Sequence, residues 1–223
     1  MCARYTMTKV SALDLAEELG VTEIATELSA QFNIAPTEEA PIVVETKEGA
    51  RRLGLARFGL VPHWAKSLKE GPRYLNARME SVAEKRAYRD ALIRHRCLVV
   101  ADGFYEWRTE GKLKVPFWFH LPEGSLFAFA GLWASWRDPE GHWVPSFTIL
   151  TREAEGPVRA IHDRMPLILA PEAYGPWLDR ELQDLEQILP LLEQARAGEL
   201  QAREVSRRVN DVKNDGPELL DPV

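Results

Sequence analysis

The feature that most constrains this fold is a succession of short extended-type runs in the middle of the chain. Turn signals such as Glu110-Gly111 and Glu123-Gly124 separate these runs, which are rich in β-branched and aromatic residues. The runs are Cys97–Ala101, Phe104–Arg108, Pro116–Leu121, Leu126–Trp136 and Val144–Leu150. So many strands within so short a stretch predict a β-rich core.

Helical patterns lie outside this region. We predict helices over Ser11–Leu19, Ser81–Arg94, Pro171–Leu178 and Arg180–Gln194, the last interrupted by Pro190. Further short strands are predicted over Pro41–Val44, Leu53–Val61 and Leu200–Val205. No internal repeat, low-complexity linker or shift in composition marks a boundary. The sequence therefore predicts one α+β domain over residues 1–223, with a β-rich core and helices on its periphery.

The composition excludes several classes of protein. Seven Trp, eight Phe and five Tyr among 223 residues exclude intrinsic disorder. No apolar run approaches ~20 residues, so we expect no membrane-spanning helix. The N-terminus lacks the apolar segment of a secretory signal, which predicts a cytoplasmic protein. The two cysteines and five histidines have neither disulfide-framework nor zinc-ligand spacing, so we expect no metal and a buried, structural Cys97.

The net charge of −6 argues at first against a nucleic-acid partner. The charge is uneven, however, because residues 11–49 carry nine acidic groups and one Lys, whereas residues 51–114 carry fifteen basic and seven acidic groups. An excess of +8 over residues 51–114 can create a positive surface, since fields act over ~8–10 Å. The alternative is that these charges lie on ordinary solvated faces.

Cys2 is the first residue whose chemistry stands out. Removal of Met1 would give Cys2 a free α-amine with a pKa of ~7.7–8.0 beside a thiol of pKa ~8.5. Such a 1,2-aminothiol condenses with an aldehyde to a Schiff base, and the thiol then closes a thiazolidine ring. No internal processing is needed, because Cys2 directly follows the initiator. The alternative is that Cys2 is an incidental second residue.

Two further residues are candidates for proton transfer. Glu106 lies in the aromatic run Phe104–Arg108, where partial desolvation would favour the protonated carboxyl. His162 lies between charged residues and a Pro-fixed turn, and its imidazole can move protons near neutral pH. The alternatives are a surface Glu106 paired with Arg108 and a structural His162 hydrogen-bonded in its turn.

Two stretches suit nucleic acid. Asn76 and Arg78 share a face if their segment is extended, and an amide beside a guanidinium suits sugar–phosphate oxygens. Trp64 is followed by several basic residues, and aromatic rings flanked by cations suit unpaired bases. The alternatives are a turn Asn with a solvated Arg, and a core Trp64.

Several ordered blocks together resemble the SOS-response-associated peptidase (SRAP) family along essentially the whole chain. They are Met1–Tyr5, Phe32–Pro36, Gly59–Trp64, Asn76–Glu80, Ala101–Trp107, Ile161–Pro166 and Val205–Pro222. The resemblance implies a mixed α+β fold with a twisted β-barrel-like core. It also implies a DNA-repair protein, linked by the family name to the SOS response, that shields abasic sites in single-stranded DNA through a covalent bond to the N-terminal Cys.

The resemblance implies a role for each site residue. Cys2 would form the thiazolidine with the abasic aldehyde, and Asn76 would hold the lesion sugar and the N-terminus. Glu106 and His162 would move protons during ring opening, Schiff-base formation and reversal. The positions implied for DNA contact are Arg4, Pro36, Trp64, Arg78, Arg86, Thr151 and Arg164, of which Thr151 is the weakest candidate.

Two departures and two alternatives accompany this resemblance. Ala3 stands where the family usually has Gly, which puts the reaction rate in question, and Phe58 stands where the family often has Trp. The alternatives are a thiol autopeptidase, hence a hydrolase, with Cys2 as nucleophile, and a non-covalent single-stranded DNA-binding protein. The leading hypothesis is a monomer that crosslinks abasic DNA, with possible lyase activity and no cofactor. It would be cytoplasmic, and nucleoid-associated if bacterial; replication or repair partners are not identified by the sequence.

Overall fold

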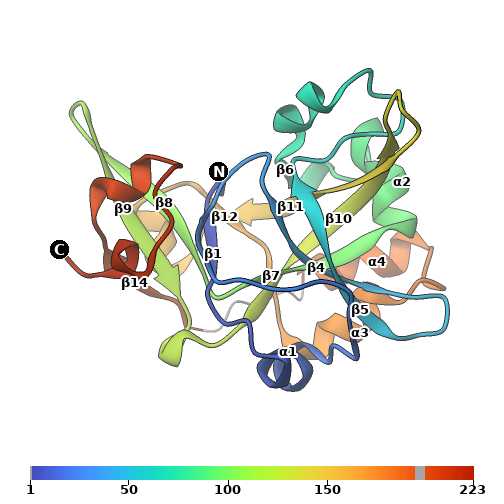
Figure 1. The fold of residues 1–223 in the computed structure, drawn as a ribbon, viewed down its shortest axis with the longest axis horizontal. Coiled ribbons are helices and arrows are strands. Elements are labelled where there is room, and N and C mark those ends of the chain that lie inside the picture. Colours follow the sequence, from blue (N-terminus) through green and yellow to red (C-terminus); the bar gives the residue numbers. More distant parts are fainter. Residues whose placement is uncertain (1, 194–198) are drawn as a thin grey trace.

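The computed structural model describes residues 2–193 and 199–223, and five of its strands form a closed β-barrel (Figure 1). The strand order is β11-β10-β7-β4-β5, and β5 pairs back onto β11 through Ser146↔Arg57 and Phe147↔Phe58. The barrel strands are β4 (Glu39–Glu45), β5 (Arg51–Phe58), β7 (Arg96–Ala101), β10 (Phe127–Arg137) and β11 (Trp143–Glu153). The predicted α+β fold with a barrel-like core is therefore confirmed.

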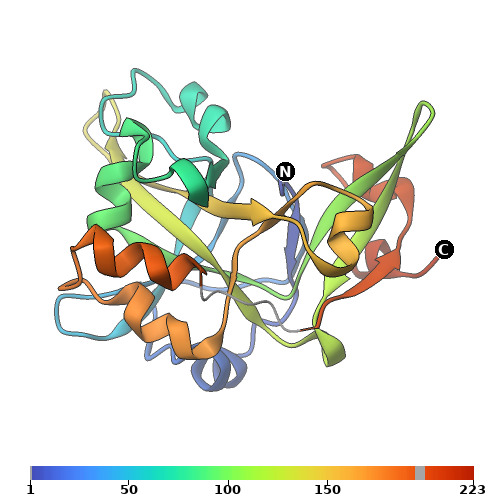
Figure 2. The ribbon, with the colours of Figure 1, turned by 180° about the vertical axis from the view of Figure 1, so that it is seen from behind.

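A second sheet of five strands stands beside the barrel, in the order β14-β9-β8-β1-β3. Its strands are β1 (Tyr5–Met7), β3 (Gln31–Ile34), β8 (Gly103–Glu110), β9 (Leu113–His120) and β14 (Gln201–Glu204). Both views show β1 on the side of this sheet that is nearer to the barrel (Figures 1 and 2). The N-terminal strand thus lies where the two sheets meet.

Four short strands complete the barrel sheet: β2 (Glu23–Ile24), β6 (Asn76–Arg78), β12 (Arg164–Pro166) and β13 (Ile168–Leu169). β6 runs parallel to the end of β11, with Asn76 opposite Ile149. β12 pairs with the same end of β11 in antiparallel fashion, with Arg164 opposite Glu153. The last residues of β11 therefore hold Asn76 and Arg164 on either side.

The helices cover the outside of the barrel. They are α1 (Ala12–Leu19), α2 (Arg86–Arg94), α3 (Tyr174–Leu178) and α4 (Leu185–Glu193). In the part of the chain that the structure describes, seven 3-10 helices connect other elements: Leu68–Tyr74, Met79–Ser81, Pro122–Gly124, Gly156–Ala160, Pro171–Ala173, Arg207–Asn210 and Pro217–Leu220. Within the described ranges, none of the helices has the length and apolar character needed to cross a bilayer.

Two predicted helices begin later than expected. The helix predicted from Ser81 starts at Arg86, because Met79–Ser81 is a separate 3-10 turn and the backbone of Lys85 is extended. The helix predicted from Arg180 starts at Leu185, and Pro190 lies within it without ending it. In contrast, α1 follows its prediction closely, with Ser11 as N-cap and Gly20 at φ 65° as C-cap.

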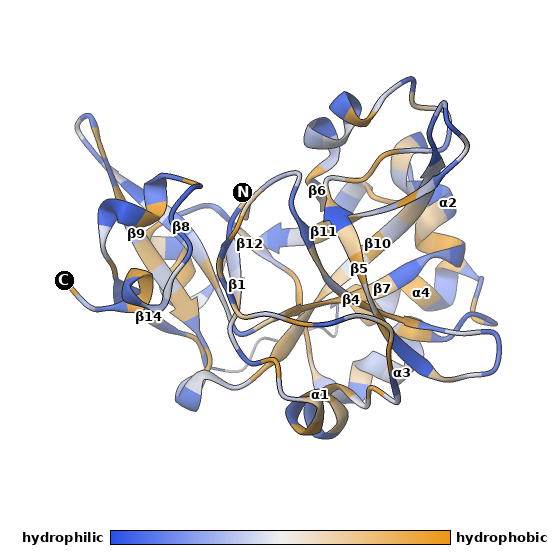
Figure 3. Cartoon of the chain, viewed as in Figure 1, coloured by the Kyte–Doolittle hydropathy of each residue, from blue (hydrophilic) through white to orange (hydrophobic). Residues whose placement is uncertain are grey.

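The core fills the barrel, where apolar residues of the central strands lie together (Figure 3). Phe58 of β5 stacks on Phe147 of β11 with ring centroids 5.2 Å apart, and Cys97 is fully buried as predicted. A second apolar cluster joins Tyr105 and Trp118 to the C-terminal residues Val205, Val209 and Leu219. The C-terminal segment is therefore packed onto the second sheet.

Asp102 fixes β1 against the turn between β7 and β8. Its buried carboxylate accepts hydrogen bonds from Thr6 Oγ1 (2.5 Å), from the backbone nitrogen of Thr8 (2.6 Å) and from that of Lys9 (3.2 Å). A buried carboxylate needs such donors to offset its desolvation. These bonds set the direction of the N-terminal segment, and hence the position of Cys2.

Candidate active site

Cys2 precedes β1 and is fully buried in the chain that carries Met1. Its Sγ lies 3.8 Å from the carbonyl oxygen of Arg4. Its own carbonyl oxygen accepts a hydrogen bond from Nδ2 of Asn76 at 2.9 Å. Asn76 has a second polar atom, Oδ1, that is buried and has no hydrogen-bond partner among the described residues. The amide thus holds Cys2 with one end and leaves an acceptor available beside it.

Glu106 is a buried carboxyl close to this thiol. It lies on β8 with an exposed fraction of 3%. Burial raises the pKa of Glu106, an effect that the nearby His162 opposes. Burial also raises the pKa of the Cys2 thiol, and the negative charge of Glu106 adds to this effect. The predicted desolvation of Glu106 is therefore confirmed, and its alternative as a surface residue paired with Arg108 is wrong.

His162 follows the 3-10 helix Gly156–Ala160 and is partly exposed. Its Nδ1 lies 2.9 Å from the backbone nitrogen of Arg164 and 2.9 Å from Oδ1 of Asp163. A neutral Nδ1 can accept from the Arg164 N–H, whereas a protonated Nδ1 can donate to the Asp163 carboxylate. Nδ1 of His162 therefore has a partner whether or not it carries a proton.

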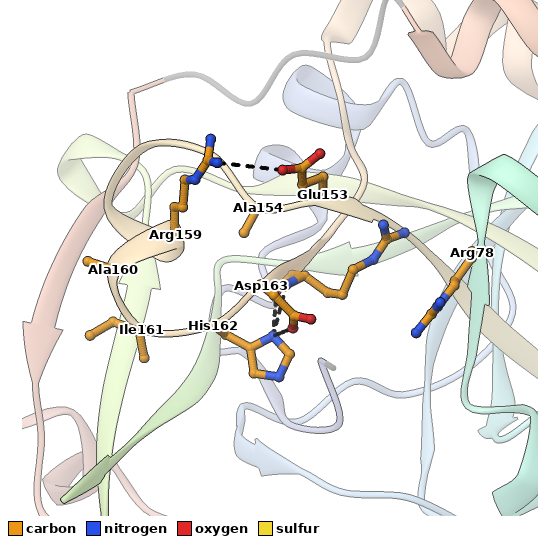
Figure 4. Close-up of a pocket in the computed structure, with 9 residues that line it drawn as sticks. Arg78, Glu153, Ala154, Arg159, Ala160, Ile161, His162 and Asp163 are labelled. Carbon is orange, nitrogen blue, oxygen red and sulfur yellow. Dashed lines mark hydrogen bonds and ion pairs between the residues drawn. The ribbon is translucent and has the colours of Figure 1, made fainter.

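Two surface cavities share His162 as a common wall. The first, the Arg78 groove, has a volume of about 620 Å³ and is drawn in Figure 4. Its lining residues are Arg78, Glu153, Ala154, Arg159, Ala160, Ile161, His162, Asp163 and Arg164. Three guanidinium groups and two carboxylates face it, so the Arg78 groove is strongly polar.

The second cavity, the Pro36 groove, has a volume of about 830 Å³. Its lining residues are Ala3, Arg4, Ala35, Pro36, Thr37, Glu38, Glu106, Trp107, Lys114, His162, Asn210 and Val212. Glu106 and His162 both face this groove, so the buried carboxyl and the imidazole can reach a molecule lying in it. The Pro36 groove is more apolar than the Arg78 groove.

Ala3 fits this position without backbone strain. The described non-glycine residues with positive φ are Thr37 and Glu123, so Ala3 has an ordinary backbone conformation. The departure noted in the sequence is therefore compatible with the local geometry.

The guanidinium of Arg4 is hydrogen-bonded to other residues of the protein. Its Nη1 donates to Oδ1 of Asn33 (2.7 Å) and to the carbonyl oxygen of Val209 (2.8 Å), and its guanidinium lies 5.8 Å from the ring of Trp107. Asn33 in turn donates from Nδ2 to the carbonyl oxygen of Asn214 at 2.8 Å. In this state Arg4 joins the N-terminal segment to the C-terminal one, while still lining the Pro36 groove.

Arg164 is also engaged. Its Nη1 and Nη2 donate to the two carboxylate oxygens of Glu80 at 2.7 and 2.9 Å, and Nη2 donates to the carbonyl oxygen of Thr151 at 2.8 Å. This ion pair lowers the pKa of Glu80. Thr151 is fully buried, so its side chain lies behind Arg164 and away from the surface. In contrast, Arg78 is exposed at the Arg78 groove.

Trp64 and Arg86 form a separate pair. The Arg86 guanidinium lies 4.9 Å from the centroid of the Trp64 ring, and both line a third cavity of about 380 Å³. Trp64 is partly exposed, so its alternative as a core residue is wrong. The structure brings Cys2, Asn76, Glu106 and His162 together, and places Trp64 and Arg86 at another cavity.

Sequence reasoning missed Asn33, Trp107 and Lys114. Trp107 and Lys114 line the Pro36 groove, and Asn33 is buried and connects Arg4 to the C-terminal segment. The C-terminal partners of Asn33 are about 180 residues away in the chain, as in its contact with Asn214. Such a contact leaves no local signal.

One group of potential metal ligands lies elsewhere. Among residues 2–193 and 199–223, Asp138, Glu140 and His142 approach one another in the turn between β10 and β11. Hydrogen bonds from the backbone nitrogen of His142 to Asp138 (2.7 Å) account for this closeness as a turn. The expected absence of a metal stays a prediction.

Comparison with known proteins gives consistent matches. A family model described as SOS response associated peptidase (SRAP) matches residues 1–212. The chain is 37% identical to the abasic site processing protein YoqW of Bacillus subtilis, over 99% of both chains. It is 32% identical to the abasic site processing protein YedK of Escherichia coli, over 86% of this chain and 85% of that one.

The fold also matches solved structures. A crystal structure of a protein from Bacteroides thetaiotaomicron aligns over 100% of both chains with a TM-score of 0.83 and 24% identity. This likeness shows a shared fold. With the family model and the relatives above, it places the chain: it belongs to the SOS response associated peptidase family.

Proposed function

We propose that this protein processes abasic sites in single-stranded DNA by forming a covalent thiazolidine through Cys2 after removal of Met1. The observation that carries the proposal is the proximity of Cys2, Asn76, Glu106 and His162, of which Glu106 lines the Pro36 groove and His162 lines both grooves. Relatives named as abasic site processing proteins support the substrate.

After Met1 is removed, the chemistry requires one condensation and one addition. Hydrolysis of the Met1–Cys2 peptide bond frees the α-amine of Cys2. The amine adds to the aldehyde carbon of the opened abasic sugar, and loss of one water gives the Schiff base. The thiol sulfur then bonds to that carbon, and its proton ends on the nitrogen, which closes the five-membered ring. No oxidant or cofactor is consumed, and the strong advantage of intramolecular closure favours the second step.

Glu106 and His162 supply the proton transfers in this proposal. Burial raises the pKa of Glu106, so this carboxyl keeps its proton to higher pH than an exposed one and can act as the acid that protonates the departing hydroxyl during Schiff-base formation. His162 faces the same groove and can take a proton from the sugar during ring opening. If His162 instead removes the proton next to the Schiff-base carbon, β-elimination cleaves the strand, which would be the lyase activity.

The DNA-binding roles follow from exposure. Arg78 can contact a phosphate directly, and Pro36 lines the groove named after it. Trp64 and Arg86 offer an aromatic surface beside a cation. Arg164 can contact a phosphate by exchanging its bond to Glu80. In this proposal Arg4 and Thr151 act by positioning, and the working unit is a monomer on DNA.

A denaturing gel tests the proposal. Mature protein is incubated with abasic and with intact single-stranded oligonucleotides, and intact-mass measurement first establishes that Met1 is gone. We expect a heat-stable shifted band with abasic DNA alone, and none with Cys2→Ser. Absence of an adduct from the mature protein, or equal yield from Cys2→Ser, would overturn the proposal.

The same experiment separates the alternatives. Salt-sensitive binding without any adduct would indicate a non-covalent single-stranded DNA-binding protein. Cleavage of peptides by Cys2 without DNA would indicate a thiol peptidase. Glu106→Gln and His162→Ala should slow adduct formation or reversal more than they weaken binding; unchanged kinetics in both would refute their roles as proton carriers.

A further inference from the structure

A second basic cavity system lies along helix α2, away from Cys2. The cavity at Trp64 and Arg86 is lined along the helix by Asp90, Arg94 and His95, among others. A smaller cavity of about 120 Å³ is lined by Val44, Glu45, Arg94, His95, Arg96, Trp133, Leu178 and Arg180. Arg94 and His95 line both cavities, so the two lie side by side, and we call them together the α2 groove.

The α2 groove has cations along its length. Arg86 begins helix α2 and Arg94 ends it, which places them ~12 Å apart along the helix axis. Arg180 enters at the far end from the segment between α3 and α4. A row of cations at this spacing suits a chain of phosphates better than a single small anion.

Arg94 is available for a ligand. It makes no hydrogen bond or ion pair with another described residue, and its side chain is exposed. Cations at a helix C-terminus often serve the free carbonyls there. In this protein Arg96 binds the carbonyls at the end of α2: its Nη1 donates to the carbonyl oxygens of Leu92 (2.9 Å) and Ile93 (2.8 Å). The end of α2 therefore does not need Arg94.

The charge balance of the groove also points to an anion. Burial lowers the pKa of His95, and the charges of Arg180 and Arg94 lower it further. Two acidic residues face the groove, Asp90 and Glu45. The Glu45 carboxylate accepts from the backbone nitrogen of Arg180 at 3.4 Å, and the Arg180 guanidinium donates to the backbone carbonyl oxygen of Glu45 at 3.5 Å, so neither contact pairs the two charged groups. The cations thus remain incompletely neutralised.

The wall of the groove adds an aromatic surface. The ring of His95 packs against Trp133 of β10 with centroids 5.0 Å apart, and Trp64 stands at the opposite end. Cations alternating with aromatic rings are the usual means of binding single-stranded nucleic acid without sequence preference. This composition favours a polynucleotide over an acidic peptide.

We propose that the α2 groove binds the phosphodiester backbone of single-stranded DNA that flanks the nucleotide at Cys2, with Arg94 and Arg180 contacting phosphates beyond Trp64. This inference rests on the proposed function, because it extends the path of the same DNA strand. It assigns to the protein a binding site longer than the lesion and its immediate neighbours.

Oligonucleotide length tests this proposal. The probes carry tetrahydrofuran, an abasic analogue without an aldehyde, and are about 6 or about 16 nucleotides long, within the range of single-strand site sizes. Two long probes are used, extended on either side of the analogue. We expect one of the long probes to bind more tightly than the short one, and the gain to be lost in Arg94→Ala/Arg180→Ala.

Salt dependence gives a second readout. Loss of two phosphate contacts should reduce the slope of log affinity against log salt by about 1.4 for the long probe, since each contact on a single strand contributes about 0.7. The short probe should show no change. Arg207→Ala removes an exposed cation from the C-terminal 3-10 helix and is the matched control.

The results that would overturn the α2 groove differ from the results that would overturn the proposed function. Equal binding of short and long probes by the wild-type protein, or an unchanged slope in the double variant, would overturn the α2 groove even if abasic oligonucleotides still form adducts. Arg94→Lys/Arg180→Lys should keep the slope, and thermal unfolding of each variant checks that the fold is intact. Failure of adduct formation with the short abasic oligonucleotide would instead count against the proposed chemistry.

Discussion

The side-chain amide of Asn76 donates a hydrogen bond to the carbonyl oxygen of Cys2 across 74 residues of sequence, with Nδ2 and O 2.9 Å apart. Asn76 is itself held by the pairing of β6 with β11. The N-terminal segment is thereby attached to the barrel at the residue that carries the reactive groups. Oδ1 of the same amide is buried and has no partner among the described residues.

Replacement of Asn76 should slow the reaction at Cys2 much more than it lowers the stability of the fold. Asn76→Ala removes the bond to Cys2, so we expect the free energy of unfolding to fall by only about 1 kcal/mol. The adduct rate should fall at least about tenfold, because loss of positioning near a reaction centre is costly. Single-turnover gels and urea unfolding measure the two effects. An adduct rate equal to that of the wild type would show that the amide is not needed.

Replacement of Glu80 should strengthen DNA binding. Glu80 occupies the two nitrogens with which Arg164 would contact a phosphate. Because Glu80→Gln removes this competing charge, we expect affinity for single-stranded DNA to rise several-fold, whereas Arg164→Ala should lower it. Fluorescence anisotropy at fixed salt measures both. Glu84→Gln, an exposed carboxylate nearby in the chain, is the control, and an equal gain from it would indicate a general charge effect.

The raised pKa of Glu106 predicts a specific pH dependence of stability. In the folded protein Glu106 binds its proton more tightly than at its ordinary pKa of 4.5. Its contribution is therefore fully present below pH 4.5 and is lost as pH rises through the folded value. We expect the free energy of unfolding of Glu106→Gln, relative to wild type, to increase as pH rises above 4.5.

Urea unfolding across this pH range measures the difference. Glu110→Gln, at the exposed end of the same strand, provides the comparison. If the Glu106→Gln difference were constant with pH, burial would not be raising the pKa of this carboxyl.

Tyr5 has a buried hydroxyl without a hydrogen-bond partner among the residues that the structure describes. Its ring is held edge-on against Phe58 and Phe129. Since an unsatisfied buried hydroxyl costs about 1–3 kcal/mol, we expect Tyr5→Phe to raise the free energy of unfolding by an amount in this range. Thermal and urea unfolding provide the measurement.

Tyr105→Phe is the matched control for Tyr5→Phe. The Tyr105 hydroxyl donates to the carbonyl oxygen of Phe32 at 2.8 Å, so its loss should lower stability by about 1 kcal/mol. A loss of stability in Tyr5→Phe similar to that in Tyr105→Phe would mean that the Tyr5 hydroxyl has a partner in solution.

The sequence predicted the barrel strands well and the short strands poorly. The run Leu126–Trp136 became β10 and Val144–Leu150 lies within β11, because long runs of β-branched and aromatic residues carry a strong local signal. β6 and β12 have three residues each and exist only through pairing with β11. No periodicity can be read from three residues.

The charge count of the sequence was informative but incomplete. The basic segment 51–114 does supply Arg78, Arg86 and Arg94 to surface grooves. It also contains Arg96, which is buried, and Arg51, whose Nη1 donates to the carbonyl oxygen of Leu19 at 2.8 Å. A formal count gives every Arg the same weight, whereas the tertiary structure uses some of them to satisfy backbone carbonyls.

The chemistry at Cys2 could be predicted from the residue and its place in the chain, but its surroundings could not. Glu106 gave a local signal through its aromatic neighbours, and the structure buries it. The engagement of Arg164 by Glu80 joins residues 84 positions apart, and no local pattern reports it.

The bonds of Arg4 to Val209 and of Asn33 to Asn214 have a consequence for biosynthesis. The ribosome makes Cys2 at the beginning of translation, but these bonds can form only after residues 209–214 have left the exit tunnel. Until then the N-terminal segment lacks the contacts that hold it against the second sheet. The aminothiol thus reaches its final surroundings only after residues 209–214 have emerged, and a nascent chain that lacks them carries Cys2 without these contacts.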